Sequence, residues 1–153
     1  MNQRNWNIVA GEDPVVRFAA EEFSRLMSKM DPQASVRIEK SFDLPDTQIL
    51  FIEKDLCPSL PKTEDPIIDD AICIRVKNCA GKICGANERS VLIAVYRFFR
   101  EAGCVFVRPG RSGEFVPEVD SSLLTVELCE TPAYRHRGLC LEGSNSYENV
   151  VDT

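Results

Sequence analysis

The stretch that decides the fold is Gly81-Lys82-Ile83-Cys84-Gly85-Ala86-Asn87, which leads through residues 88–102 to Gly103-Cys104-Val105-Phe106. Residues 82–85 form an apolar run typical of a strand, and Asn87 is a residue type that caps helix N-termini. Gly103 is placed to end that helix in the left-handed conformation, before a strand at 104–107. The buried positions expected on this helix are Leu92, Val95, Phe98, Phe99 and Ala102.

The other elements are predicted from helix caps, prolines and the spacing of apolar residues. A first amphipathic helix is expected to begin at Asp13-Pro14, an N-cap followed by proline, and to end at Asp31-Pro32. Residues 78–81 are expected to join two strands as a four-residue connection, and the proline-containing residues 55–70 to form a long surface loop. The positions expected to face the core from the first helix are Val16, Ala20, Phe23, Met27 and Met30. The other expected strands are 5–10, 35–39, 48–53, 71–77 and 124–128.

This order of elements, β-α-β-β-β-β-α-β-β, predicts an α+β fold. Hairpins among the middle strands favour a mixed sheet with two helices on one face over a doubly wound parallel sheet. The adjacent acids Glu21-Glu22 and Asp69-Asp70 are expected on solvated surface, because neighbouring helix positions do not face the same way.

Charge and cysteine content narrow the classes of partner and the kinds of site that this chain could have. The 153 residues carry 18 Lys and Arg against 24 Asp and Glu, a net charge of −6, which argues against nucleic-acid binding through a basic surface. The apolar run 91–96 is far too short to span a membrane. The seven cysteines are odd in number and contain no Cys-x-x-Cys pair, so we expect reduced thiols in apolar strands rather than disulfides or a metal site. Reduced thiols favour the cytoplasm.

The residues after Glu130 do not fit this domain. Residues 131–134 indicate a linker and 135–143 another strand, while 144–152 open a helical pattern that stops. We therefore expect residues 1–130 to be a complete domain and 131–153 to be a linker with the first strand and truncated first helix of the next one. If that strand opens a (β/α)8 barrel, Glu142 lies at its carboxyl end, where such barrels hold their active sites. A surface salt bridge involving Arg137 and Glu142 is the alternative.

No residue of the chain is assigned to catalysis. The strand–glycine–helix junctions at Gly11 and Gly85 lack a phosphate-binding motif, so they predict ordinary turns and caps, and a nucleotide-dependent enzyme is disfavoured. The only histidine, His136, stands between two arginines and has no nucleophile that the sequence can pair with it.

The run 81–85, the helix 87–99, Gly103-Cys104-Val105-Phe106 and Pro109-Gly110 together resemble the N-terminal non-catalytic domain of certain glycoside hydrolases. These are the family 20 β-N-acetylhexosaminidases, the α-glucuronidases and related bacterial proteins. Residues 8–11 with 19–26 are similar to the opening strand and helix of that domain. The resemblance covers residues 5–130, and the order of the motifs carries it.

The resemblance implies an accessory domain that packs against its own downstream catalytic (β/α)8 barrel, with carbohydrate bound by the full-length protein. Arg137 and Gly138 match the Arg-Gly strand that binds sugar hydroxyls in hexosaminidases, and Glu142 takes the acidic place, where aspartate is usual. Two departures are Ser90, where glycine is expected, and the lack of a Ser-Arg-His continuation after Glu142. The catalytic carboxylates would lie beyond residue 153, so we assign no catalytic residue, metal or cofactor to this chain. The alternative is an independent carbohydrate- or protein-binding module.

Overall fold

The computed structural model describes residues 4–134, which form one six-stranded sheet, one two-stranded sheet and two α-helices. The predicted strand at 135–143 and the helix after it lie outside the described residues. In chain order the helices and strands are β1 (Asn5–Ala10), α1 (Pro14–Met30), β2 (Ser35–Glu39), β3 (Leu50–Lys54), β4 (Ile72–Lys77), β5 (Ala80–Gly85), α2 (Glu88–Glu101), β6 (Val105–Phe106), β7 (Glu114–Phe115) and β8 (Thr125–Glu130). Three short 3-10 turns, at Asp46–Gln48, Arg111–Gly113 and Ser121–Leu123, join them. No helix in this part of the chain has the length and apolar character needed to cross a membrane.

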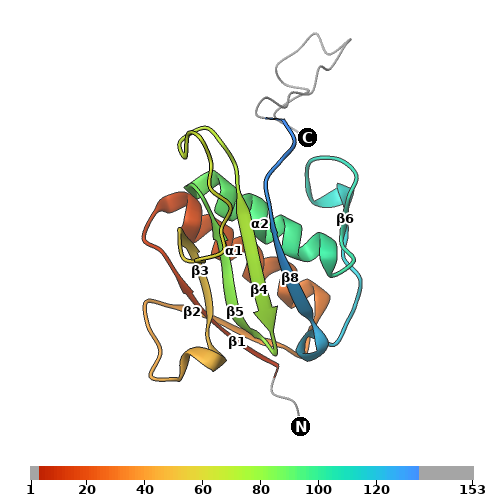
Figure 1. Cartoon of the computed structure of the whole chain (residues 1–153). Helices are drawn as coiled ribbons and strands as arrows, with labels where there is room; N and C mark the ends of the chain where they lie inside the picture. Colours follow the sequence, from red (N-terminus) through yellow and green to blue (C-terminus); the bar gives the residue numbers. More distant parts are fainter. Residues whose placement is uncertain (1–3, 135–153) are drawn as a thin grey trace.

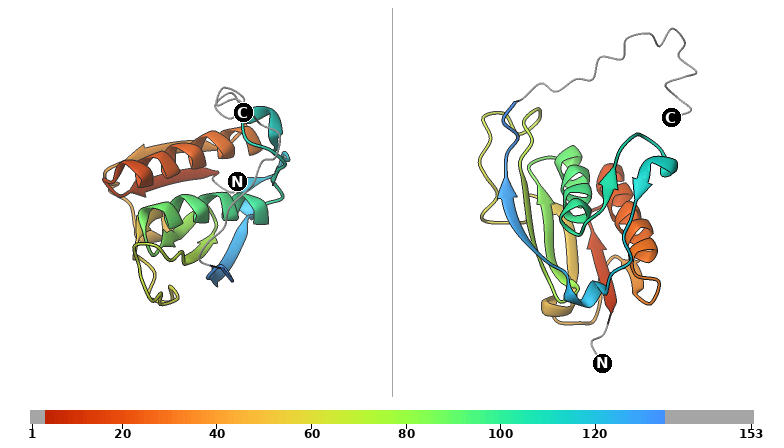
Figure 2. Two further views of the ribbon diagram at one scale, coloured as in Figure 1. Left: turned by 90° about the horizontal axis from the view of Figure 1, so that it is seen from above. Right: turned by 90° about the vertical axis from the view of Figure 1, so that its right-hand side faces the viewer.

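The large sheet is mixed, as the hairpin pattern predicts. Its strand order is β2-β1-β3-β5-β4-β8; β2, β1, β3 and β5 run parallel, and β4 runs antiparallel to both of its neighbours. Both helices lie side by side on one face of this sheet (Figure 1; Figure 2). The predicted α+β class with two helices on one face is confirmed.

The caps predicted for both helices are present. The Asp13 carboxylate accepts hydrogen bonds from the backbone N–H groups of Val15 and Val16, and α1 ends before Asp31. The Asn87 side chain accepts from the Ser90 N–H, and Gly103 follows α2 with φ +97°. The two strand–glycine–helix junctions are therefore turn-and-cap structures.

The buried face of α2 is rotated from the predicted one. Val91 and Ala94 are buried together with the predicted Val95, Phe98 and Phe99, whereas Leu92 and Ala102 are only partly buried. Apolar residues surround most of this helix, so periodicity alone does not fix its rotation. That rotation is set by packing against both the sheet and α1.

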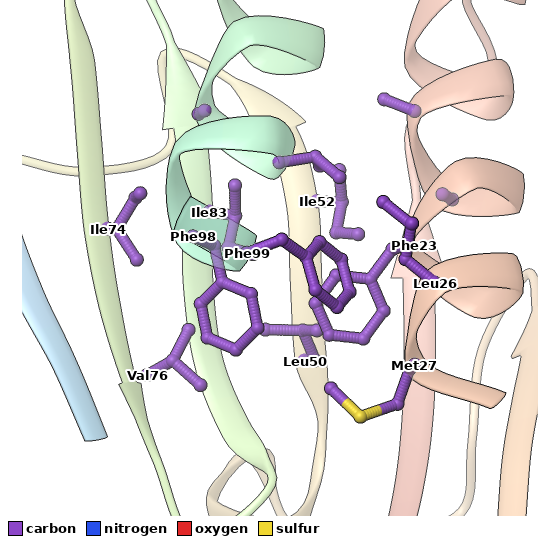
Figure 3. Packing of buried hydrophobic residues seen from close by; sticks show 14 of the residues in the cluster. Phe23, Leu26, Met27, Leu50, Ile52, Ile74, Val76, Ile83, Phe98 and Phe99 are labelled. Carbon is purple, nitrogen blue, oxygen red and sulfur yellow. The ribbon is translucent and has the colours of Figure 1, made fainter. Parts of the chain in front are cut away.

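The core lies between the helices and the sheet, around the rings of Trp6, Phe23, Phe98 and Phe99. Figure 3 shows the three phenylalanine rings meeting between the two helices. The ring centroid of Phe23 on α1 lies 5.3 Å from that of Phe98 and 5.1 Å from that of Phe99, both on α2. Trp6 on β1 packs 5.2 Å from Phe23, and its indole N–H donates to the Ser121 hydroxyl at 3.1 Å. All four rings are fully buried and pack in tilted or edge-on arrangements, which favour attraction between aromatic groups.

The β4–β5 hairpin is tighter than predicted. Lys77 pairs directly with Ala80, so the connection is the two residues Asn78 and Cys79, with φ of 53° and 61°. Two positive φ values are the signature of a type I′ turn, which normally carries glycine in its second position. Cys79 takes that position here and buries its thiol, which lies 3.7 Å from the Ser121 carbonyl oxygen. The missing glycine is the reason why the sequence did not reveal the short turn.

The predicted loop 55–70 contains no helix or strand. Its first part lies on the sheet face opposite the helices (Figure 2), and residues 66–70 reach the start of α2, where Asn87 and Arg89 donate to their backbone carbonyl groups. The loop brings Cys57 onto Cys73 and Cys84, and all three are buried.

The prediction that every cysteine is a reduced thiol is wrong for two of them, because Cys73 and Cys129 form a disulfide. They are 56 residues apart but directly paired on antiparallel strands, with a Cα–Cα distance of 4.0 Å. Spacing in the sequence does not reveal such a pairing, because it arises only from the register of β8 on β4.

We predict that Gly85→Ala destabilises the protein by about 1–3 kcal/mol, because a Cβ at this position would lie 2.5 Å from backbone atoms of Ser90 and Val91 at the start of α2. Gly11→Ala is the matched control: its Cβ would meet only the movable side chain of Glu53, so we expect a smaller loss. Urea unfolding of both variants measures the difference. Equal losses would contradict a tight strand-to-helix contact at Gly85.

Candidate functional site

The predicted sugar-binding residues Arg137 and Glu142, and His136 beside them, lie outside the described residues. Within residues 4–134, the features that point to function gather around the small β6–β7 hairpin beyond the end of α2 (Figure 1). The strand predicted at 104–107 is shorter than expected, because only Val105 and Phe106 pair with β7, whose strand was not predicted.

The register of the hairpin gives its two sides different partners. Val105 pairs with Phe115, and Phe106 pairs with Glu114. Because side chains alternate across a strand, the first pair lies on one side of the hairpin and the second pair on the other. Phe106 packs edge-on against Tyr96 of α2, with ring centroids 5.2 Å apart, so the Phe106–Glu114 side faces the domain.

Glu114 is held by an arginine from α1. Arg25 donates to the two carboxylate oxygens of Glu114 at 2.8 and 2.7 Å. The same guanidinium donates to both oxygens of Glu22 at 2.8 and 2.9 Å, and the Tyr96 hydroxyl donates to Glu22 at 2.6 Å. Two-point contacts of this kind are strong and directional. This anchor, Glu22-Arg25-Tyr96-Glu114, fastens the hairpin to both helices.

The anchor shifts the ionisation of its members. The Arg25 hydrogen bonds lower the pKa of Glu22 and of Glu114, and the two carboxylates raise the pKa of Arg25. Burial, together with the hydrogen bond to Glu22, raises the pKa of Tyr96 to about 12. The anchor therefore holds one cation between two carboxylates at neutral pH, and Tyr96 stays a hydrogen-bond donor.

A groove of about 790 Å³ lies between the C-terminal half of α2 and residues 104–110. Tyr96 and Arg100 line it from α2, Phe106 and Arg108 from the hairpin, and Glu114 from β7. Arg108 contacts the nearby Ser112 hydroxyl at 3.3 Å, and both arginines are exposed. Guanidinium groups beside aromatic rings can bind polar ligands such as hydroxyl-rich or anionic molecules.

The other side of the hairpin is apolar and exposed. Val105 keeps 49%, Phe115 62% and Val107 77% of its accessible surface, and Val105 and Val107 also line the groove. We call these three residues the hairpin patch. Apolar side chains grouped in this way on a surface typically mark an interaction site.

No family model matches the chain, and no curated protein matches it. Among residues 4–134, no group of three or more His, Cys, Asp or Glu side chains could hold a metal ion.

Two predictions for acidic residues are wrong. Glu22, expected on solvated surface, has a side chain only 13% exposed within the anchor. Asp70, also expected at the surface, is buried and accepts hydrogen bonds from the Ser90 hydroxyl and from Arg89. The three-residue spacing of Glu22 and Arg25 is a signal that could have suggested an ion pair. Nothing local pointed to Glu114, which is 89 residues from Arg25.

We predict that Arg25→Met lowers stability at neutral pH by about 2–3 kcal/mol, because it removes the guanidinium that two largely buried carboxylates share and leaves Glu114 only the Lys29 ammonium at 3.9 Å. Glu22 and Glu114 have lowered pKa values, so their contribution is present above the ordinary glutamate pKa and is lost as the pH falls through the folded value. The gap between the native chain and Arg25→Met should therefore shrink below about pH 4.

Urea unfolding at a series of pH values measures this gap. Arg17→Met on the same helix is the control, since Arg17 is exposed and its loss should change stability by no more than about 0.5 kcal/mol. A gap for Arg25→Met that does not change with pH would contradict the ionic anchor.

Proposed function

We propose that this domain is the non-catalytic N-terminal accessory domain of a glycoside hydrolase, and that it packs against a catalytic (β/α)8 barrel supplied by the following chain. The resemblance of residues 5–130 and the α+β fold support the proposal. In it, Arg137 and Glu142 belong to the first barrel strand and contact the sugar. The carboxylates that cleave the glycosidic bond belong to the barrel, and this domain supports the barrel in carbohydrate degradation.

The observation that carries the proposal is that the hairpin patch is exposed while the anchor fixes the position of the hairpin. Burial of apolar surface stabilises a protein by about 25 cal/mol per Å², so the exposed patch would gain free energy by docking. The anchor prevents the hairpin from turning this side inward, because Glu114 is bound to Arg25 and Phe106 to Tyr96. A patch held outward in this way is suited to docking on a second folded body.

The described cysteines bear on the compartment in two ways. Four described cysteines, Cys57, Cys79, Cys84 and Cys104, are free thiols, which supports the cytoplasm. The Cys73–Cys129 disulfide favours a more oxidising location.

The groove beside the patch favours a second candidate function, a carbohydrate-binding module that works without a barrel. Arg100, Arg108 and the edges of Tyr96 and Phe106 supply the polar and aromatic groups that such a site needs. Titration of oligosaccharides into the 153-residue chain separates the two candidates. Saturable binding that Arg108→Ala abolishes would favour the module, and its absence would favour the accessory domain.

We predict that Val107→Glu weakens docking in the longer protein, expressed with the reading frame that follows Thr153. The charged side chain would be forced into the apolar interface, so the barrel should lose activity on aryl glycosides at a lower temperature. In the 153-residue chain the same change should leave stability within about 0.5 kcal/mol, because the site is exposed.

Ile67→Glu is the matched control, because Ile67 is 79% exposed, much like Val107 at 77%. It lies between Pro66 and Ile68, whose carbonyl oxygens accept hydrogen bonds from Asn87 and Arg89 at the start of α2, the opposite end of that helix from the hairpin. We expect it to have no effect on the longer protein. A reading frame without a following barrel would contradict the proposal, as would equal thermal inactivation of the two variants. Glycosidase activity in the 153-residue chain would also overturn it.

A further inference from the structure

Four cysteines converge on the sheet face opposite the helices. Cys84 on β5, Cys73 on β4 and Cys129 on β8 lie directly opposite one another across three neighbouring strands. Cys57, from the loop 55–70, packs onto this row. The disulfide joins Cys73 to Cys129, so Cys84 and Cys57 are the two free thiols of the group.

The two thiols lie in one buried cluster. The Asp55 N–H donates to the Gly85 carbonyl oxygen at 3.0 Å, which holds the start of the loop beside Cys84, and the Cys57 Sγ lies 4.0 Å from the Cys73 carbonyl oxygen. Interaction with the Cys84 thiol lowers the pKa of Cys57. The positive charges of Lys82 and Arg75, adjacent on β5 and β4, act in the same direction on Cys57. The pKa of Cys84 is raised by its interaction with the Cys57 thiol and by burial, with a smaller contribution from the Asp55 carboxylate. One thiol of the pair is thus the better thiolate and the other its proton donor, the division of roles found in redox-active dithiols.

We propose that Cys57 and Cys84 form a redox-active dithiol that is oxidised to a disulfide by low-molecular-weight disulfides, such as oxidised glutathione. The Cys57 thiolate attacks one sulfur of the small disulfide, forms a mixed disulfide and releases one thiolate. Cys84 then gives up its proton and attacks the Cys57 sulfur, which releases the second small thiol. In total the protein loses two protons and two electrons, and the small disulfide gains them to become two thiols.

The product would tie the loop to the centre of the sheet. In the reduced chain, apolar contacts of Leu56, Leu60 and the cysteines hold the loop at this point, together with hydrogen bonds of Ser59 to Arg75 at 3.1 Å and to the sulfurs of the neighbouring disulfide. A bond from Cys57 to Cys84 would replace these contacts with a covalent link beside the existing disulfide. Because the loop has no regular secondary structure, its opening is the route by which a small disulfide reaches Cys57.

The chain contains a matched control thiol. Cys104 is 4% exposed, as is Cys57, but it has no cysteine partner among the described residues, and burial raises its pKa to about 11. With equal exposure, a difference in reactivity reports on the dithiol environment instead of on access. At neutral pH, we expect the initial rate of modification by oxidised glutathione to be at least about tenfold higher for Cys57 than for Cys104.

The test is peptide mapping of the 153-residue chain after incubation in glutathione buffers of increasing oxidised fraction, followed by acid quench and alkylation. We expect a Cys57–Cys84 linked peptide to appear while the Cys73–Cys129 peptide persists and Cys104 is still alkylated. Cys84→Ala should stop the reaction at the mixed disulfide on Cys57, and Cys104→Ala should change nothing. Circular dichroism verifies that each variant is folded.

Several outcomes would overturn the proposal. One is that Cys57 and Cys84 both remain alkylatable in buffers that oxidise a reduced Cys73–Cys129 pair. Another is that Cys57 and Cys104 react at the same rate. A third is a product linking Cys84 to Cys73, which would show that the row on the sheet, and not the loop cysteine, is the reactive unit. If Cys84→Ala fails to fold, the native chain's peptide map and the rate comparison still decide the question.

Discussion

The contact of Phe23 with Phe98 and Phe99 is the constraint on which the rest of the structure depends. It joins α1 to α2 and holds both against one face of the sheet through Trp6. Because the rings are completely buried and tilted against one another, they fix the rotation of α2 as well as its position. That rotation directs Tyr96 toward Glu22 and Phe106, and so determines where the hairpin can attach.

The two faces of the sheet are covered by different elements. On the helix side, the anchor carries the hairpin and leaves Val105, Val107 and Phe115 outside. On the other side there is no helix in the described part of the chain, and the loop 55–70 covers part of the sheet with a cluster of cysteines. The docking proposal and the dithiol proposal therefore concern opposite sides of one sheet, and either can fail without the other.

Local features of the sequence predicted most of the fold. Asp13, Asn87 and Gly103 mark helix ends through chemistry that acts over a few residues, and all three predictions are confirmed. Features that depend on long-range register were missed. The Cys73–Cys129 bond requires β8 to lie beside β4, and the Arg25–Glu114 pair requires the hairpin to fold back on α1. The I′ turn at Asn78-Cys79 was missed because its usual glycine is absent. Arg137 and Glu142 lie outside the described residues, so their proposed contact with sugar stays a prediction.

Hydrogen exchange tests the docking claim most directly, with the 153-residue chain compared with the longer protein that includes the following sequence. The account predicts that the amides of 105–107 and 114–115 exchange more slowly in the longer protein, because docking on the barrel covers the hairpin patch. The amides of 61–69, in the loop that reaches the other end of α2 from the hairpin, should exchange equally in both. Unchanged exchange at the hairpin, with protection appearing over 61–69 instead, would contradict the account.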